Sequence, residues 1–318
     1  MQTLSYLQRG LLELLAAAPA FEQDACTALS SPGKLLAPAG SRPSPGVWAL
    51  LPWYVARYLA PDLPLQVAQL VALSVECLVC ALDVLDDIED EDRSPALEAL
   101  GKRRALQVST VLQMLAQRAL LDTGGALPDD RVYQLLETLN SCLSKAVIGQ
   151  HRDLLAEHLA VEQLTVEQVL EIAEGKAGAL LRLACELPAV AAGAGEMSIR
   201  QWSELGELLG VASQLDNDAH DLYAILELPD EDRNEVSGGK SDLRRGKKTL
   251  PVILAAQRGP LQWPLAEADT TSEAFLREGI VLTWGICLML KQRAEACRRQ
   301  IERVRPLPPE LLHLLEQV

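Results

Sequence analysis

The sequence predicts an all-α protein, and three observations support this prediction. Hydrophobic residues make up 49% of the 318 residues, whereas aromatic residues make up only 4%. The apolar residues are mainly alanine and leucine, which favour helices over strands. No stretch of useful length alternates between apolar and polar residues as a strand does. Because no repeat and no low-complexity linker divides the chain, we expect residues 1–318 to form a single-domain helical bundle.

The expected helices are separated by short segments rich in glycine, proline and aspartate. The first of these segments runs from Ser30 to Gly46, and its four prolines and three glycines exclude a continuous helix. The spacing of apolar residues predicts helices over residues 47–59, 65–90, 97–121, 130–160, 166–187, 200–226, 250–257 and 272–301, and at the C-terminal end.

Two helix starts match the reciprocal capping box, in which a Ser or Thr and a Gln three residues later each bind the other's backbone amide. The two pairs are Thr165 with Gln168 and Ser198 with Gln201. We therefore expect helices to begin just after Thr165 and just after Ser198.

The chain is acidic, with 29 Lys and Arg against 44 Asp and Glu and a formal net charge of −15. This charge argues against nucleic-acid binding, because a polyanion would meet a surface of its own sign. The seven cysteines are scattered and odd in number, which is not typical of a secreted disulfide framework. No basic leader precedes the apolar N-terminal stretch, and no uncharged apolar run reaches the roughly 18 residues of a membrane span. We expect a cytoplasmic protein without a transmembrane segment.

A first acidic cluster closes the apolar helix expected over residues 65–90. Asp83, Asp86, Asp87 and Asp90 stand three and four residues apart, which places them on one helical face. Their like charges repel each other at a helix C-terminus, where the helix dipole already disfavours anions. Oxygen ligands without His or Cys suit a hard cation such as Mg²⁺. The alternative is an acidic helix end that is simply solvated.

A second acidic cluster lies about 130 residues later, in the helix expected over residues 200–226. Asn217, Asp218 and Asp221 share one face, and Gln214 lies one turn earlier. Two such clusters can face each other across a helical bundle and hold metal ions between them. Carboxylates that bind Mg²⁺ can thereby bind the phosphate oxygens of a diphosphate.

Candidate cations for direct diphosphate contacts occur in two places. The segment from Gly239 to Pro251 carries Lys240, Arg244, Arg245, Lys247 and Lys248, and Lys176 is an isolated cation in an apolar stretch. Lys176 could instead extend to the surface, and the basic segment could be a solvated turn.

Taken together, these residues resemble the trans-isoprenyl diphosphate synthase, or polyprenyl synthetase, family, along with the ComQ-type prenyltransferases and terpene synthases that share its fold. The resemblance runs from about Gly40 to Gln257. Five segments match family motifs in the family's order: the DDxxD of Asp86–Asp90, the GQxxDL that begins at Gly149, the lysine segment Gly175–Ala177, the second aspartate motif of Gln214–Asp221, and the SDLxxGKxTLP of Ser241–Pro251.

The resemblance implies an isoprenoid-synthase fold and a role for each of these residues. A cluster of Mg²⁺ ions, three in the family that it resembles, would be bound by Asp86, Asp87, Asp90, Asn217, Asp218 and Asp221. Asp86, Asp87, Lys176 and Lys247 are the expected catalytic residues. An allylic prenyl diphosphate would contact Arg42, Lys176, Gln214, Arg244, Arg245 and Lys247. The family also suggests a homodimer.

The departures from the family's pattern concern the site that binds isopentenyl diphosphate in chain-elongating members. The GGKRxRP loop is replaced by residues 39–45, which keep Arg42 but lose the lysine and the second arginine. Val79 stands where the family has a histidine, and Arg93-Ser94 replaces an arginine pair. One arginine offsets little of the cost of desolvating a diphosphate, so we expect this second site to be absent. Arg93, Lys102, Arg103 or Arg104 would substitute only if the fold brings them close.

The expected activity is therefore ionisation of an allylic prenyl diphosphate, with the carbocation either cyclised or passed to an acceptor other than isopentenyl diphosphate. Asn217-Asp218 resembles the terpene synthases and ComQ, whereas Asp221 and Ile225 depart from the terpene synthase pattern. Chain elongation and a catalytically silent partner subunit are the alternatives.

Two smaller features are interpreted as packing. Cys77 and Cys80 lie inside an apolar helix without a second pair, so buried packing is favoured over zinc binding. His220 lies within the second acidic cluster, and a packing or supporting role is favoured over proton transfer.

Overall fold

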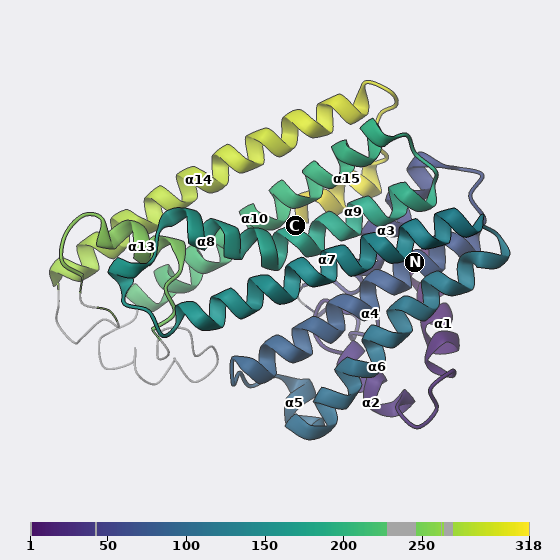
Figure 1. Cartoon of the computed structure of the whole chain (residues 1–318), viewed down its shortest axis with the longest axis horizontal. Coiled ribbons are helices and arrows are strands. Elements are labelled where there is room, and N and C mark those ends of the chain that lie inside the picture. Colours follow the sequence, from purple (N-terminus) through teal and green to yellow (C-terminus); the bar gives the residue numbers. More distant parts are fainter. Residues whose placement is uncertain (1, 42, 228–245, 262, 264–269, 318) are drawn as a thin grey trace. The chain divides into compact units, whose positions relative to one another are not determined.

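The computed structural model describes residues 2–41, 43–227, 246–261, 263 and 270–317 (Figure 1). All regular structure in these ranges is helical, without a strand, which confirms the predicted all-α class. The chain divides into two compact units. Unit 1 comprises residues 1–142, 182–206 and 299–318, and unit 2 comprises residues 143–181 and 207–298. The single domain expected from the sequence stays a prediction.

Unit 1 is organised around α4 (Leu65–Glu89), which packs against α3 (Val47–Leu59) and α6 (Lys102–Leu121). Apolar residues surround α4 on most sides, and the hydroxyl of Ser109 in α6 donates to the carbonyl of Ala81 at 2.8 Å. The unit also contains α1 (Gln2–Leu15), α2 (Glu22–Leu29), α5 (Pro95–Leu100), the 3₁₀ turn η1 (Asp122–Gly125) and α15 (Pro309–Gln317).

Helix α4 is the one described helix whose length and mean hydropathy would allow it to cross a membrane. Its most apolar window has a mean hydropathy of 2.0, and 83% of that window is buried inside the protein. The core helix of a globular protein has the same composition, so this helix is weak evidence for a membrane span. Cys77 and Cys80 lie in it as free, buried thiols, as the packing interpretation expects.

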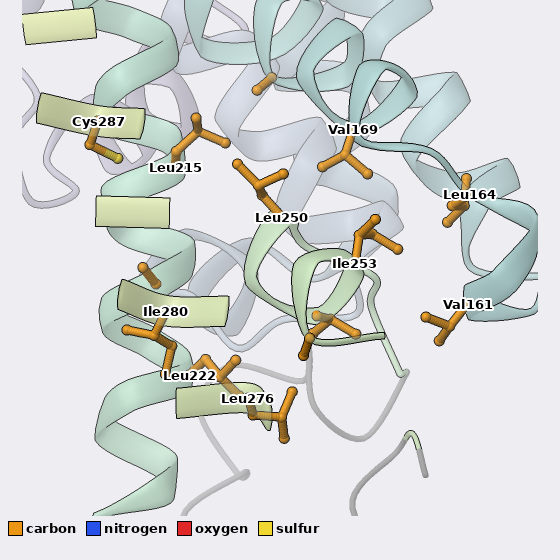
Figure 2. Packing of buried hydrophobic residues seen from close by; sticks show 14 of the residues in the cluster. Val161, Leu164, Val169, Leu215, Leu222, Leu250, Ile253, Leu276, Ile280 and Cys287 are labelled. Atoms are coloured by element: carbon orange, nitrogen blue, oxygen red, sulfur yellow. The ribbon is translucent and has the colours of Figure 1, made fainter. Parts of the chain in front are cut away.

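Unit 2 contains η2 (Val161–Gln163), α8 (Val166–Ala173), the π-helical segment η3 (Glu174–Gly178) and α13 (Leu250–Ala256). Its core lies between these elements and two long helices, α10 (Glu196–Leu226) and α14 (Thr270–Glu302), which run side by side (Figure 1). Figure 2 shows Leu250 and Ile253 of α13 in this core, with Leu215 of α10, Ile280 of α14 and Val169 of α8 around them.

Helices α7 (Asp129–Ala156), α9 (Ala179–Ala191), α10 and α14 contribute residues to both units. Most predicted helices are present, and α3 has its predicted bounds. The helix predicted over 97–121 is wrong in one respect, because it is divided. Ser94 caps the short α5, and Gly101, at φ 70°, separates α5 from α6.

The two capping boxes have different outcomes. Thr165 accepts from the backbone N–H of Gln168 at 3.2 Å, and the Gln168 side chain accepts from the N–H of Thr165 at 2.9 Å. This pair therefore begins α8 as predicted. The box at Ser198 is wrong, because α10 already begins at Glu196 and Ser198 lies within its first turn. Helices α1 and α2 were not among the predicted helices.

Candidate functional site

The first acidic cluster lies at the C-terminal end of α4, where the helix stops without a glycine. Asp90 caps the helix, and its N–H donates to the carbonyl of Asp86 at 2.7 Å. Glu91 then adopts a left-handed conformation at φ 55°, and the N–H of Asp92 donates to the carbonyl of Asp87 at 3.0 Å. This pairing is a Schellman-type helix end in which Glu91 takes the position that usually favours glycine. The chain thus turns away immediately after the last aspartate of the motif.

Burial and like charge act together on this cluster. Asp90 is only 5% exposed, and Asp86 and Asp87 are half-buried. The pKa of Asp87 is raised, first by burial and then by the charges of Asp83 and Asp92, against a hydrogen bond from Ser94. Burial and the neighbouring carboxylates both disfavour the charged form of Asp87, and a bound cation would offset this cost.

The second acidic cluster occupies one face of α10 within unit 2. The side-chain amide of Gln214 donates to Oδ1 of Asp218 at 2.9 Å, so these two residues contact each other as their spacing predicts. Asp218 and Asp221 are half-buried and Asn217 is exposed. The side chains of this cluster are therefore accessible along one stripe of the helix.

A neighbouring face of α10 carries a different set of contacts. His220 lies over Trp284 of α14, with the ring centroids 5.3 Å apart, and its Nδ1 is 2.8 Å from the carbonyl oxygen of Asp216. The ammonium of Lys291 lies 3.3 Å from Asp216. His220 thus packs against α14, which agrees with the packing role favoured from the sequence.

A buried charged group, which we call the lysine centre, consists of Asp153, Lys176 and Lys247. The Lys176 ammonium lies 2.8 Å from Oδ2 of Asp153, and the Lys247 ammonium lies 3.2 Å from the same oxygen. The three side chains are between 11% and 14% exposed. Burial acts to raise the pKa of Asp153, but the two ammonium groups outweigh it and lower this pKa overall. The centre therefore brings two ammonium groups to one carboxylate.

Close backbone contacts place Lys176 in this centre. A Cβ atom on Gly149 would lie 2.7 Å from the backbone of Gly175, and one on Gly210 would lie 2.3 Å from the carbonyl oxygen of Ala177. Only glycine allows α7, η3 and α10 to approach so closely. A π-helical turn such as η3 re-aims side chains within a helix and is frequent at functional sites. Asp153 lies one turn beyond Gly149, which brings its carboxylate to Lys176.

Asp153 was predicted only as part of a motif and was not assigned to the site. The spacing of four residues between Gly149 and Asp153 could have indicated its role. This spacing places the carboxylate of Asp153 on the same face of α7 as the backbone contact between Gly149 and Gly175. Gln150, from the same motif, is also notable. Both polar atoms of its side chain are buried and have no hydrogen-bond partner within the described part of the chain.

The remaining cations differ in their surroundings. The Lys248 ammonium donates to the carbonyl of Glu157 at 2.7 Å, and burial lowers the pKa of Lys248. In unit 1, Arg104 pairs with Asp24, and Lys102 lies 3.8 Å from Glu91. The predicted site residues Arg42, Arg244 and Arg245, together with Lys240, lie outside the described residues.

The predicted site residues are thus distributed over both units. Asp86, Asp87 and Asp90 belong to unit 1, whereas the lysine centre and the second acidic cluster belong to unit 2. Among the described residues, no group of three or more His, Cys, Asp or Glu side chains is placed to hold a metal ion.

The sequence and the fold were compared with known proteins. A family model described as "Polyprenyl synthetase" matches residues 49–271. The chain is 29% identical to geranylfarnesyl diphosphate synthase of Aeropyrum pernix, over 59% of this chain and 58% of that protein. It is 30% identical to (2E,6E)-farnesyl diphosphate synthase of Mycobacterium tuberculosis, over 59% of this chain and 50% of that protein. It is 29% identical to the tryptophan prenyltransferase ComQ of Bacillus spizizenii, over 57% of this chain and 56% of that protein. The chain therefore matches only between half and three fifths of the length of these relatives.

Solved structures resemble the fold over almost the whole chain. Geranylgeranyl pyrophosphate synthetase from Pyrococcus horikoshii matches with a TM-score of 0.76 at 19% identity, over 99% of this chain and 94% of that chain. A polyprenyl synthase from Caulobacter crescentus, complexed with calcium and isoprenyl diphosphate, matches with a TM-score of 0.74 at 22% identity, over 98% and 92%. At these identities the likeness shows the fold alone.

Proposed function

Because this chain belongs to the polyprenyl synthetase family, we propose that it is an enzyme that ionises an allylic prenyl diphosphate and releases diphosphate. The observation that carries the proposal is the lysine centre, where two buried ammonium groups both contact the carboxylate of Asp153. Two ammonium groups held close together in this way suit a polyanionic leaving group. As the C–O bond breaks, negative charge grows on the diphosphate, and cations fixed beforehand stabilise that charge more than the ground state.

Each described site residue has a role in this proposal. Lys176 and Lys247 would bind the diphosphate directly, and Asp153 would hold their ammonium groups in place. Gln214 would orient Asp218 through the hydrogen bond between their side chains. Arg42, Arg244 and Arg245 are proposed as further diphosphate contacts.

A divalent cation completes the proposed site. Asp86, Asp87, Asp90, Asn217, Asp218 and Asp221 offer carboxylate and amide oxygens, which fit Mg²⁺. Because the described acidic residues form no preassembled group of three ligands, diphosphate oxygens would complete the coordination. When bound, Mg²⁺ would neutralise charge on the departing diphosphate. The calcium and isoprenyl diphosphate named with the Caulobacter structure support this choice of ligands, and three ions are proposed from the family resemblance.

We propose that the prenyl carbocation either cyclises within its own chain or is passed to an acceptor other than isopentenyl diphosphate. The loss of the basic loop residues supports this, and so do Lys102 and Arg104, which lie beside Glu91 and Asp24. The ComQ relative is named as a prenyltransferase that acts on tryptophan. Chain elongation is the second candidate, because other relatives are named as synthases of prenyl diphosphates. A silent subunit is disfavoured by the retention of both acidic clusters.

The test is diphosphate release from geranyl, farnesyl and geranylgeranyl diphosphates with and without Mg²⁺, with mass spectrometry of the organic products. Mg²⁺-dependent release with cyclic or non-elongated products is expected. Longer prenyl diphosphates that form only when isopentenyl diphosphate is added would instead establish elongation. No release from any of the three substrates would contradict the proposal and favour the silent subunit.

A homodimer is part of the proposal. It rests on the family resemblance, and the exposed Met114 of α6 and Tyr133 of α7 are candidate contacts. Light scattering coupled to size-exclusion chromatography should give about twice the monomer mass. A monomer at micromolar concentration would contradict this part of the proposal.

A further inference from the structure

Lys34 and Leu35, which lie in the segment before α3, fasten that segment to α4. The N–H of Leu35 donates to Oε1 of Glu76 at 2.6 Å, and the Lys34 ammonium donates to Oδ2 of Asp83. Glu76 and Asp83 are seven residues apart, about two helical turns, and therefore lie on one face of α4. The fold thus places a lysine against the helix that ends in the first acidic cluster.

The lysine is buried although its partner is not. Lys34 is 4% exposed and Glu76 is fully buried, whereas the Asp83 side chain is 51% exposed. Burial, the largest influence, acts to lower the pKa of Lys34, yet this pKa is raised overall because Asp83, Cys80 and Glu76 lie close. Lys34 therefore remains an ammonium ion at neutral pH.

The charges of this pair reach the first acidic cluster. Asp83 precedes Asp86 by three residues and Asp87 by four, spacings at which like charges on a helix repel. The Lys34 ammonium is bound to Asp83 and therefore lies close to the same end of α4. The two side chains thus place opposite charges near Asp86 and Asp87.

We propose that Lys34 and Asp83 form a charge-balancing pair that sets the affinity of the first acidic cluster for Mg²⁺. Within the cluster, Asp83 adds negative charge next to the proposed ligands Asp86, Asp87 and Asp90, and Lys34 cancels that charge. Neither residue is a metal ligand; both are positioning residues that act through their electric field. The electrostatic interaction energy of a divalent ion with this pair is twice that of a monovalent ion at the same position. The inference rests on the proposed function, because it requires that the cluster binds Mg²⁺.

The test is a Mg²⁺ titration by isothermal calorimetry in the presence of inorganic diphosphate, with the melting temperature of each variant as a second readout. Lys34→Met leaves Asp83 uncompensated and should lower the Kd for Mg²⁺ by about three- to tenfold. Asp83→Asn leaves the buried ammonium uncompensated and should raise this Kd by a similar factor. The double variant should return to within about twofold of the wild type.

The matched control is Arg182→Met, which breaks a partly buried ion pair with Glu186 in the same unit. It should lower the melting temperature and leave the Mg²⁺ titration unchanged. If Lys34→Met fails to fold, Asp83→Asn still tests the proposal, because the half-exposed Asp83 tolerates an amide of the same size.

Three results would overturn the inference in distinguishable ways. If both single variants lower the melting temperature but leave the Kd for Mg²⁺ within twofold, the pair is only a structural link. A shift in the same direction in both variants would exclude charge balancing. Absence of Mg²⁺ binding to the wild-type protein would refute the proposed function itself, and the pair with it.

Discussion

The ammonium of Lys176 in η3 lies 2.8 Å from the carboxylate of Asp153 in α7. Asp153 also binds Lys247, so one anion holds two cations that would otherwise repel each other. The contact depends on Gly149 and Gly175, which bring the two backbones together. The geometry of the lysine centre is thus built from local glycine contacts and one shared carboxylate.

Asp153→Asn should weaken this centre in two ways. The two ammonium groups lose their shared counter-charge and move apart, so kcat/KM for an allylic diphosphate should fall by roughly 10- to 100-fold. The loss of a mostly buried ion-pair partner should also cost about 3 kcal/mol of stability. Steady-state kinetics and chemical denaturation measure the two effects. Unchanged kinetics in a destabilised protein would limit Asp153 to a structural role.

Lys247 and Lys248 are neighbours with different contacts, and their substitutions should separate binding from stability. Lys247→Met removes a proposed diphosphate contact and should lower kcat/KM by about 100-fold, equivalent to about 2.7 kcal/mol. Lys248→Met removes a hydrogen bond to the carbonyl of Glu157 and should cost about 1 kcal/mol of stability, with little change in kcat/KM. Equal kinetic losses in both variants would argue against the assignment of Lys247.

Much of the fold followed from the sequence because its signals are local. Apolar spacing and flanking glycine and proline fix α3, and the reciprocal contacts of Thr165 and Gln168 start α8. The split of α5 from α6 was not predicted, although its signal, the positive φ of Gly101, is also local.

The parts that could not be predicted depend on contacts between distant segments. Lys34 lies in a loop rich in proline and glycine, and its partner Asp83 is 49 residues away in the chain. Nothing in the spacing of either residue indicates the other. The same is true of Asp153 and Lys247, because a shared carboxylate becomes visible only when three elements pack together.

The two sides of α10 provide a matched pair of aspartates for the metal proposal. Asp218→Ala should abolish Mg²⁺-dependent turnover with a stability change within about 1 kcal/mol, because removing a repelled acid seldom destabilises. Asp216→Ala breaks contacts with Lys291 and His220 on the neighbouring face and should retain most of the activity. Diphosphate release assays measure both. Loss of activity in Asp216→Ala equal to that in Asp218→Ala would contradict the proposed division of the helix.

Glu76 should make the stability of the protein depend on pH between about 4.5 and 7. Burial raises the pKa of Glu76 to about 7, against opposing effects from Lys34 and the N–H of Leu35. Because the folded pKa lies above the unfolded value of 4.5, the folded state retains a proton that the unfolded chain releases. The contribution is fully present below pH 4.5 and is lost as the pH rises through 7, at a cost of up to about 3 kcal/mol.

Glu76→Gln removes this titration but keeps an oxygen that can accept from Leu35. Relative to the wild type, its melting temperature should therefore rise by about 4 °C between pH 5 and pH 8. The control is Glu137→Gln, at an exposed position in α7, whose difference from the wild type should stay constant over the same range. Thermal melts monitored by circular dichroism at both pH values measure the difference. A Glu76→Gln protein with the same pH profile as the wild type would show that Glu76 does not carry this dependence.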